Sequence, residues 1–223
     1  MNKSIYFKEW IKVHLYVLVA ALVWIGFTAY VILDIRHDIT FTGAELLWLS
    51  IMDFDQMLIG SIRHLPVFLA FGLAIVQFVP EMQDKRLKLT LHLPVNQKRI
   101  ILDMLSFGLA LLLVFFLFQL GSVWIYLDSV LAKELVCLIL GTSLTWYAAG
   151  LMVYLMTAWI IIEPTWSRRI VNALVAFGIL HLLFYSNAPC AYAPMTLWIV
   201  LWLIAMLAFP LYSADRFKRG CQD

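Results

Sequence analysis

The stretch that organises this chain is residues 78–99, with the sequence FVPEMQDKRLKLTLHLPVNQKR. It is the longest polar interruption between two long apolar runs, and it holds five of the sixteen lysine and arginine residues. Its first half is charged, leucines then alternate from Leu87 to Leu93, and Pro94 ends the pattern. A charged segment between two runs that are each long enough to cross a bilayer is typical of a loop between membrane spans.

The composition excludes a soluble domain. Apolar residues make up 64% of the chain and charged residues only 13%, and the mean hydropathy is +0.91. A soluble domain of this length has about one quarter charged residues, because it must cover its surface with polar groups. The three cysteines show no paired spacing that indicates a zinc site.

The apolar segments predict an all-α, polytopic membrane protein that forms a single transmembrane domain over residues 1–223. Each apolar segment is about the length that crosses 30 Å of hydrocarbon as a helix. Residues 1–12 mix apolar and basic side chains, which favours an amphipathic interfacial helix whose Lys8 and Lys12 face water. The alternative is a simple basic flank. The six predicted spans are about 13–33, 57–79, 100–127, 135–162, 170–186 and 195–212.

The distribution of positive charge predicts the orientation. If the N-terminus is inside, thirteen of the sixteen lysine and arginine residues fall in the inner segments, and only Arg36, Arg63 and Lys133 fall outside. This bias follows the positive-inside rule. It requires an even number of spans, which six satisfies. We therefore expect both termini and residues 80–99 to be cytoplasmic, in a multi-pass protein of the cell's inner or plasma membrane.

The sequence shows no chemistry of its own that could drive directed work. No acidic or basic residue lies near the middle of a predicted span, where proton relays and ion-coupled carriers place such groups. Nucleophile-elbow, zinc-protease and phosphate-loop motifs are absent. We expect no catalytic residue, no metal site, no cofactor, no nucleic-acid partner and no enzyme activity, so any energy must enter from a partner protein.

The natural entry point is the cytoplasmic segment 80–99. Pro80 and Glu81 suit the start of a helix, since proline fits the first turn and a carboxylate complements the positive end of the helix dipole. Leu87, Leu91 and Pro94 then share one face. Exposed leucines on a short helix predict a docking element for a protein, and the alternative is a basic loop that lies on lipid headgroups.

The same residues resemble a known motif. Glu81, the run Lys85-Arg86-Leu87 and the ending Leu93-Pro94-Val95 are similar to the coupling loop of ABC-2-type permeases, the membrane subunits of ATP-binding-cassette transporters. The six spans, the amphipathic start and the large loop before the third span resemble that family along the whole chain. Two features differ from the family pattern: Asn96-Gln97 stands where Ser-Arg is common, and Asp103 lies about where a lysine is frequent.

The resemblance implies an exporter permease that is driven by a separate ATPase subunit and pairs with a second copy or a homologue within the lipid bilayer. It implies that the short link 163–169 makes a second, smaller contact with the ATPase. The alternative is a non-transporting membrane scaffold or assembly protein, while an intramembrane enzyme or ion-coupled carrier would need charges at depth. The residues that the resemblance places at the ATPase contact are Glu81, Lys85, Arg86, Leu87, Leu91, Pro94, Arg168 and Arg169.

Overall fold

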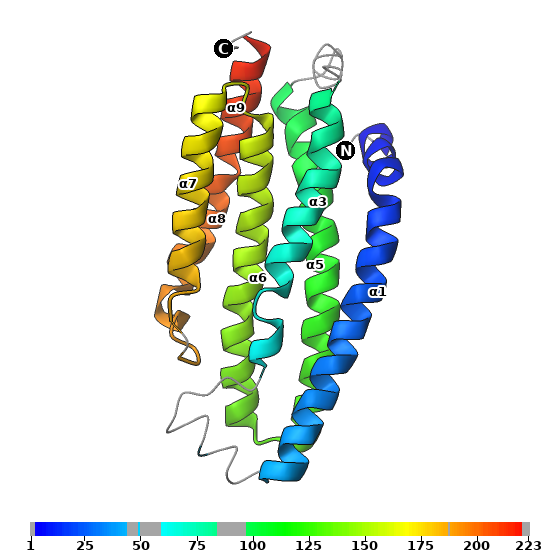
Figure 1. Cartoon of the computed structure of the whole chain (residues 1–223), viewed down its shortest axis with the longest axis vertical. Coiled ribbons are helices and arrows are strands. Elements are labelled where there is room, and N and C mark those ends of the chain that lie inside the picture. Colours follow the sequence, from blue (N-terminus) through cyan, green and yellow to red (C-terminus); the bar gives the residue numbers. More distant parts are fainter. Residues whose placement is uncertain (1–2, 44–48, 50–58, 84–96, 187, 220–223) are drawn as a thin grey trace.

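The computed structural model describes residues 3–43, 49, 59–83, 97–186 and 188–219. All regular structure in these residues is helical, and the long helices run up and down in one elongated bundle (Figure 1). Helix α1 ends where Gly43 adopts a φ of 81°, a left-handed conformation that glycine tolerates. The helices are α1 (Lys3–Thr42), α3 (Leu65–Met82), α5 (Gln97–Val130), α6 (Lys133–Ile162), α7 (Trp166–Leu183), α8 (Thr196–Met206) and α9 (Ala208–Lys218), with short 3-10 turns at Gly60–Ile62 and Ala193–Met195.

Five segments of the described chain are long and apolar enough to cross a membrane, as a multi-pass membrane protein requires. Helices α8 and α9 together make one of them, because α9 continues α8 after a break at Leu207. The break lies three residues before Pro210, whose missing N–H is tolerated in a first turn. The five segments are Ser4–Phe41, Leu65–Met82, Gln97–Val130, Lys133–Ile162 and Ala193–Lys218.

The predicted span 170–186 overlaps helix α7, which is not one of these five segments. Its eighteen residues include Arg168, Arg169, Asn172 and His181, and these lower its mean hydropathy. The described chain thus has five candidate spans plus one less apolar helix of similar direction and length to α3 (Figure 1).

Both termini lie at the same end of the bundle, together with the end of α3 and the start of α5 (Figure 1). We call this the basic end, because the helix ends that meet here carry most of the positive side chains. By the positive-inside rule it is the end predicted to face the cytoplasm. The described lysines and arginines at this end are Lys8, Lys12, Lys98, Arg99, Arg168, Arg169, Arg216, Lys218 and Arg219.

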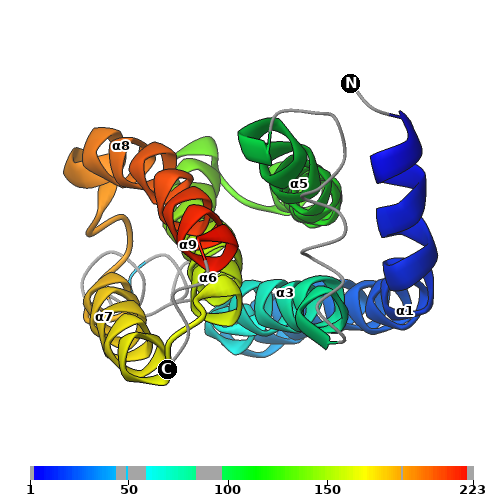
Figure 2. The ribbon, with the colours of Figure 1, turned by 90° about the horizontal axis from the view of Figure 1, so that it is seen from above.

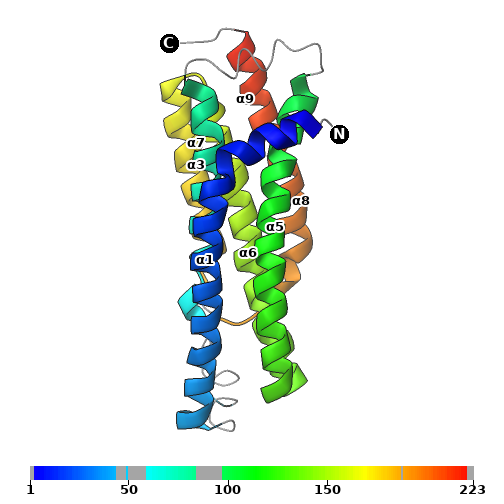
Figure 3. The same cartoon turned by 90° about the vertical axis from the view of Figure 1, so that its right-hand side faces the viewer.

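Helix α1 is continuous but bent. Figure 3 shows its first turns turning away from the long axis and crossing the basic end toward α5. The Tyr6 hydroxyl lies 2.7 Å from the Ser106 hydroxyl of α5. Further along, the Tyr16 hydroxyl donates to the Leu69 carbonyl of α3, and the Trp24 indole donates to the Phe115 carbonyl of α5, at 2.9 Å. These bonds hold both parts of α1 against the bundle.

The bent part differs from the sequence prediction at one of its two lysines. Phe7, Trp10 and Ile11 are exposed, whereas Glu9 is fully buried and the Lys12 side chain is only 16% exposed. The prediction that Lys12 faces water is therefore wrong. Lys12 pairs with the carboxylates of Glu9 and Glu81 inside the bundle. Phe7, Trp10 and Ile11 remain on the outer surface, where lipid would solvate them.

Helix α6 is the central helix of the bundle (Figure 2). It packs against α3, α5, α7, α8 and α9. Every residue from Met152 to Ala158 is buried, as expected of a helix that is apolar on all sides and surrounded by other helices. The helix therefore links the packing of these neighbours to one another.

A close approach between α3, α5 and α6 depends on a glycine. The Tyr154 hydroxyl of α6 donates to the Gln77 side-chain oxygen of α3 at 2.7 Å, and the Gln77 amide donates to the Met104 carbonyl of α5 at 2.8 Å. A Cβ placed on Gly108 would overlap the Tyr154 hydroxyl oxygen. Only glycine leaves room for this buried hydrogen-bond chain.

We predict that Gly108→Ala lowers the free energy of unfolding by about 1–3 kcal/mol, because the added methyl group forces Tyr154 or α5 to shift. The measurement is unfolding of the purified protein by SDS in mixed micelles. Gly121→Ala is the matched control on the same helix, since a methyl group added there would meet no neighbouring atom within 4 Å. It should be neutral or stabilise by up to about 1 kcal/mol. Equal losses in both variants would contradict the packing role of Gly108.

Candidate functional site

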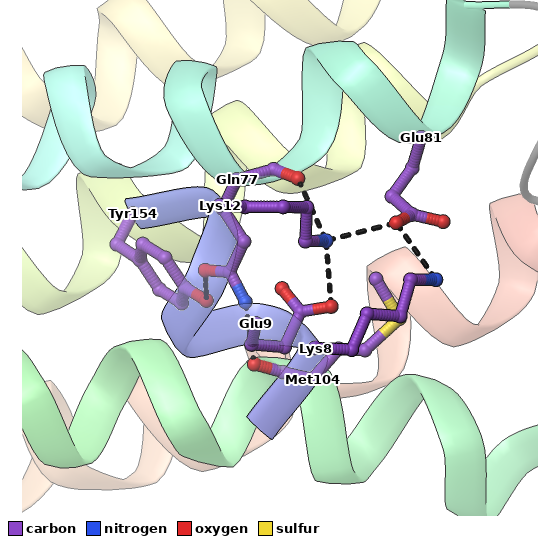
Figure 4. Close-up of polar contacts among 7 residues, drawn as sticks. All are labelled: Lys8, Glu9, Lys12, Gln77, Glu81, Met104 and Tyr154. Carbon is purple, nitrogen blue, oxygen red and sulfur yellow. Dashed lines mark hydrogen bonds and ion pairs between the residues drawn. The ribbon is translucent and has the colours of Figure 1, made fainter. Parts of the chain in front are cut away.

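A cluster of four charged side chains joins the bent start of α1 to the end of α3. We call it the N-terminal clasp; Figure 4 shows it with the polar residues around it. The Lys12 ammonium lies 2.8 Å from Glu81 Oε1 and 2.6 Å from Glu9 Oε1. The Lys8 ammonium lies 2.9 Å from the same Glu81 oxygen. The members of the clasp are Lys8, Glu9, Lys12 and Glu81.

The clasp is balanced in charge and largely removed from solvent. Glu9 is 0% exposed and Glu81 is 2% exposed, whereas the Lys8 side chain is 42% exposed at the edge. Two carboxylates face two ammonium groups, so no net charge is buried. Leaving one of these charges unpaired in such surroundings would cost several kcal/mol of stability. Each buried charge therefore requires an oppositely charged member of the clasp beside it.

The clasp continues into the bundle through Gln77. The Lys12 ammonium lies 3.4 Å from the Gln77 carbonyl oxygen, one turn before Glu81 on α3. The Gln77 side chain then bonds Tyr154 and the Met104 carbonyl, as described above. A chain of polar contacts therefore runs from the basic end into the packed region of α3, α5 and α6 (Figure 4).

A second cluster joins the end of α6 to α9, and we call it the C-terminal clasp. Glu163, the first residue after α6, is 1% exposed. Its carboxylate accepts hydrogen bonds from the Ser213 hydroxyl at 2.5 Å and the Thr165 hydroxyl at 3.1 Å, and it pairs with the Arg216 guanidinium. The members are Glu163, Thr165, Ser213 and Arg216.

The two arginines of the 163–169 link have different surroundings. Arg169 Nε donates to the Glu163 carbonyl oxygen at 2.6 Å, and its guanidinium lies 5.3 Å from the centre of the Trp166 ring. It thereby covers the last carbonyl groups of α6, where a cation is favourable. Arg168 is exposed. Of the two, Arg168 is the side chain that a partner at the basic end would meet first.

The structure changes the interpretation of Glu81. The sequence predicted that Pro80 and Glu81 begin a helix, but both lie in the last turns of α3, so that prediction is wrong. A proline so close to the C-terminal end removes only one bond of the helical ladder. The Glu81 carboxylate points toward α1 and binds lysines of its own chain, so a direct contact with a partner does not fit this position (Figure 4).

The other predicted contact residues of the 80–99 segment lie outside the described residues, and their role stays a prediction. They are Lys85, Arg86, Leu87, Leu91 and Pro94. The structure does place the two helix ends that flank them, Met82 and Gln97, at the basic end, together with Arg168 and Arg169 (Figure 1).

Sequence reasoning missed Glu9, Gln77 and Ser213. Glu9 had one available signal, because it lies three residues before Lys12 and so shares a helix face with it. Gln77 is the one polar side chain in an otherwise apolar part of α3, which suggests a buried hydrogen-bonding role. Nothing in the sequence pairs Ser213 with Glu163, which is fifty residues away.

Comparisons with protein-family models, with curated proteins and with solved structures find no match to this chain. Over the part of the chain that the structure describes, the fold is all-α, with five helical segments that are long and apolar enough to span a membrane. Its most distinctive local feature is the pair of clasps at one end.

We predict that Glu81→Gln destabilises the protein by about 3 kcal/mol, because it leaves Lys8 and Lys12 with one carboxylate between them. Unfolding in mixed SDS micelles measures the change. The control is Glu134→Gln, which removes the same charge from an exposed position at the opposite end of the bundle and should cost less than about 1 kcal/mol. If the two variants behave alike, the clasp contributes nothing to stability.

For the C-terminal clasp we predict that Glu163 and Arg216 are coupled. Glu163→Gln, Arg216→Gln and the double variant form a double-mutant cycle with an expected coupling free energy of about 2 kcal/mol. The exposed pair of Asp215 on α9 and Arg219, the residue after that helix, provides the control cycle; their guanidinium nitrogen and carboxylate oxygen are 2.6 Å apart. Its coupling should stay below about 1 kcal/mol. Equal coupling in both cycles would contradict a buried, structural role for Glu163.

Proposed function

We propose that this chain is the permease subunit of an ATP-binding-cassette exporter, and that a separate ATPase subunit drives it from the cytoplasm. In this proposal α7 is the sixth span, both termini are cytoplasmic, and the protein resides in the cell's inner or plasma membrane. The proposal rests on the coupling-loop resemblance of residues 78–99 and on the concentration of positive charge at the basic end.

One observation supports it most directly. Two segments are expected to meet the ATPase, residues 80–99 at the end of α3 and residues 163–169 at the end of α6. Each begins beside a buried glutamate, Glu81 or Glu163, that pairs with a terminal helix of the chain. A force applied at either connection would therefore act on two helices at once. A subunit that is moved from outside the bilayer needs such anchoring.

The arrangement suggests how the movement would spread. Residues after Met82 would pull α3 and, through Glu81, the bent start of α1. Residues at the 163–169 link would move α6 and, through Glu163, α9. Because α6 packs against α3, the two pairs of helices would shift together. Two copies, or this chain and a homologue, would enclose the transport path between them.

In this proposal Glu81 acts as an internal anchor, and the outward contacts fall to other residues. Lys85 and Arg86 would make the polar contacts with the ATPase, Leu87 and Leu91 the apolar ones, and Arg168 would contribute at the smaller site. This division keeps the role that the resemblance gives to the segment while accepting the buried position of the Glu81 side chain.

The test is co-purification with an ATP-binding-cassette ATPase encoded beside this gene. We predict that Lys85→Glu with Arg86→Glu lowers both co-purification and stimulated ATP hydrolysis at least about tenfold, because reversed charges oppose a complementary surface. Arg36→Glu with Lys133→Glu makes the same charge change on exposed positions at the other end and should leave both unchanged.

Two outcomes would count against the proposal. If the reversed-charge loop still binds and stimulates the ATPase, residues 85 and 86 do not couple the two subunits. If the protein forms a stable complex that contains no nucleotide-binding subunit, the scaffold or assembly function is the better explanation of the same topology.

A further inference from the structure

The two carboxylates of the N-terminal clasp have unequal numbers of positive partners. Glu81 Oε1 lies 2.9 Å from the Lys8 ammonium and 2.8 Å from the Lys12 ammonium. Glu9 pairs with Lys12 alone, at 2.6 Å. Glu9 is no less buried than Glu81, since both side chains are almost completely removed from solvent. Of two buried carboxylates in one cluster, Glu9 is therefore the one whose negative charge is less well compensated.

The hydrogen-bond donors around Glu9 are already in use. An ammonium group has three N–H donors. The Lys12 ammonium lies within 3.4 Å of three acceptors, which are Glu9 Oε1, Glu81 Oε1 and a carbonyl oxygen of α3. The Gln77 amide lies beside Glu9 (Figure 4), but it donates to the Met104 carbonyl at 2.8 Å. Glu9 Oε2 accepts no hydrogen bond from the residues that the structure describes. A buried carboxylate oxygen without a donor makes the ionised form unfavourable.

The charged and titratable groups around Glu9 come from each of the helices that pack here. The Tyr154 hydroxyl donates to the Gln77 side chain, so it gives no hydrogen bond to Glu9. The Asp103 side chain pairs with no member of the clasp in the described part of the chain. Lys12 thus remains the one cation that compensates Glu9 among the described residues. The groups are Lys8 and Lys12 on α1, Glu81 on α3, Asp103 beside Met104 on α5, and Tyr154 on α6.

We propose that Glu9 is a proton-binding site and that it makes the N-terminal clasp respond to cytoplasmic pH. As the pH falls, Glu9 takes up a proton before Glu81 does, because Glu81 keeps two ammonium groups at its carboxylate. The protonated Glu9 is neutral and has an O–H donor of its own, so its burial costs less. The clasp then carries a net charge of one positive. This inference rests on the geometry of the clasp and is independent of the proposed ATPase partner.

Protonation of Glu9 changes how the two lysines are shared. Without the charge of Glu9, two ammonium groups face the single carboxylate of Glu81 and repel each other. Lys8 is the one that can leave, because its side chain is 42% exposed at the edge of the clasp. Lys12 is only 16% exposed and keeps both Glu81 and the α3 carbonyl oxygen. The joint between α1 and α3 then depends on Lys12 alone.

The direction of the pH effect on stability follows from the same geometry. In the folded protein the ionised Glu9 is less favourable than it is in water, so the folded state binds this proton more readily than the unfolded chain. The contribution of Glu9 to stability is therefore greatest when it is protonated, and it falls as the pH rises through the titration of Glu9. Glu81 has the opposite behaviour, because its two ammonium partners favour its ionised form.

The experiment measures unfolding of the full-length protein by SDS in mixed micelles at about pH 7.5 and about pH 5.5, a range in which exposed carboxyl groups stay ionised. Glu9→Gln imitates the protonated acid. It should need at least as much SDS as the wild type at the higher pH and the same amount at the lower pH. Glu81→Gln should need less SDS than the wild type at both. The control Glu134→Gln, exposed at the opposite end, should follow the wild type.

Infrared spectroscopy detects the proton directly. In the wild type, the C=O stretching band of a buried carboxylic acid should appear as the pH is lowered over the same range, and Glu9→Gln should remove it. Lys8→Gln should move the band to higher pH, because the protonated clasp is then neutral. Lys218→Gln removes an exposed lysine at the same end and should not move it. The comparison of these two lysine variants decides alone if Glu9→Gln does not fold.

Four outcomes would overturn the proposal. If Glu9→Gln loses as much stability as Glu81→Gln at both pH values, Glu9 is needed as an ion. A band that persists in Glu9→Gln would assign the proton to another carboxyl group. Absence of the band from the wild type would show that Glu9 stays ionised. An equal response of Lys8→Gln and Lys218→Gln would show that the proton is not bound within the clasp.

Discussion

The structure depends on the pairing of charges that an apolar bundle would otherwise exclude. Lys12 is held between Glu9 and Glu81, and Lys8 completes the balance. No member of this clasp is favourable at its depth alone, since each buried charge needs an opposite one within reach. The bent shape of α1 follows from this requirement, because its first turns must cross the basic end for Lys8 and Lys12 to meet α3.

The same principle repeats at the other end of the chain. Glu163 is buried where α6 ends, and residues of α9 satisfy it. The two clasps place the first and last described helices against the two helices that lead into connections at the basic end. One of these two helices, α6, packs against the other, α3, and is buried at every residue from Met152 to Ala158. The bundle thus has its buried charge clusters at one end, while many large apolar side chains lie on its outer surface, where lipid would solvate them.

The sequence predicted where most of the helices lie, but it did not predict which side chains make contacts between them. The long apolar runs predicted α5 and α6, because the length and hydropathy of a span can be read from neighbouring residues. The uneven distribution of positive charge predicted the orientation. The bend of α1 could not be seen, since it depends on Glu81, about seventy residues away in the chain. For the same reason Glu81 looked like the start of a surface helix, with its proline in the first turn. The Gly108 contact depends on where three helices cross, which no local pattern encodes.

The i,i+3 pair of Lys12 and Glu9 has a consequence for biosynthesis. The first helix enters the membrane before the second has been made, so its charges have no partner on α3 at that time. Lys12 already has Glu9 on its own helix, 2.6 Å away in the finished protein. The local pair compensates the charge of Lys12 during insertion, and Glu81 then adds a contact between two helices that also takes in Lys8.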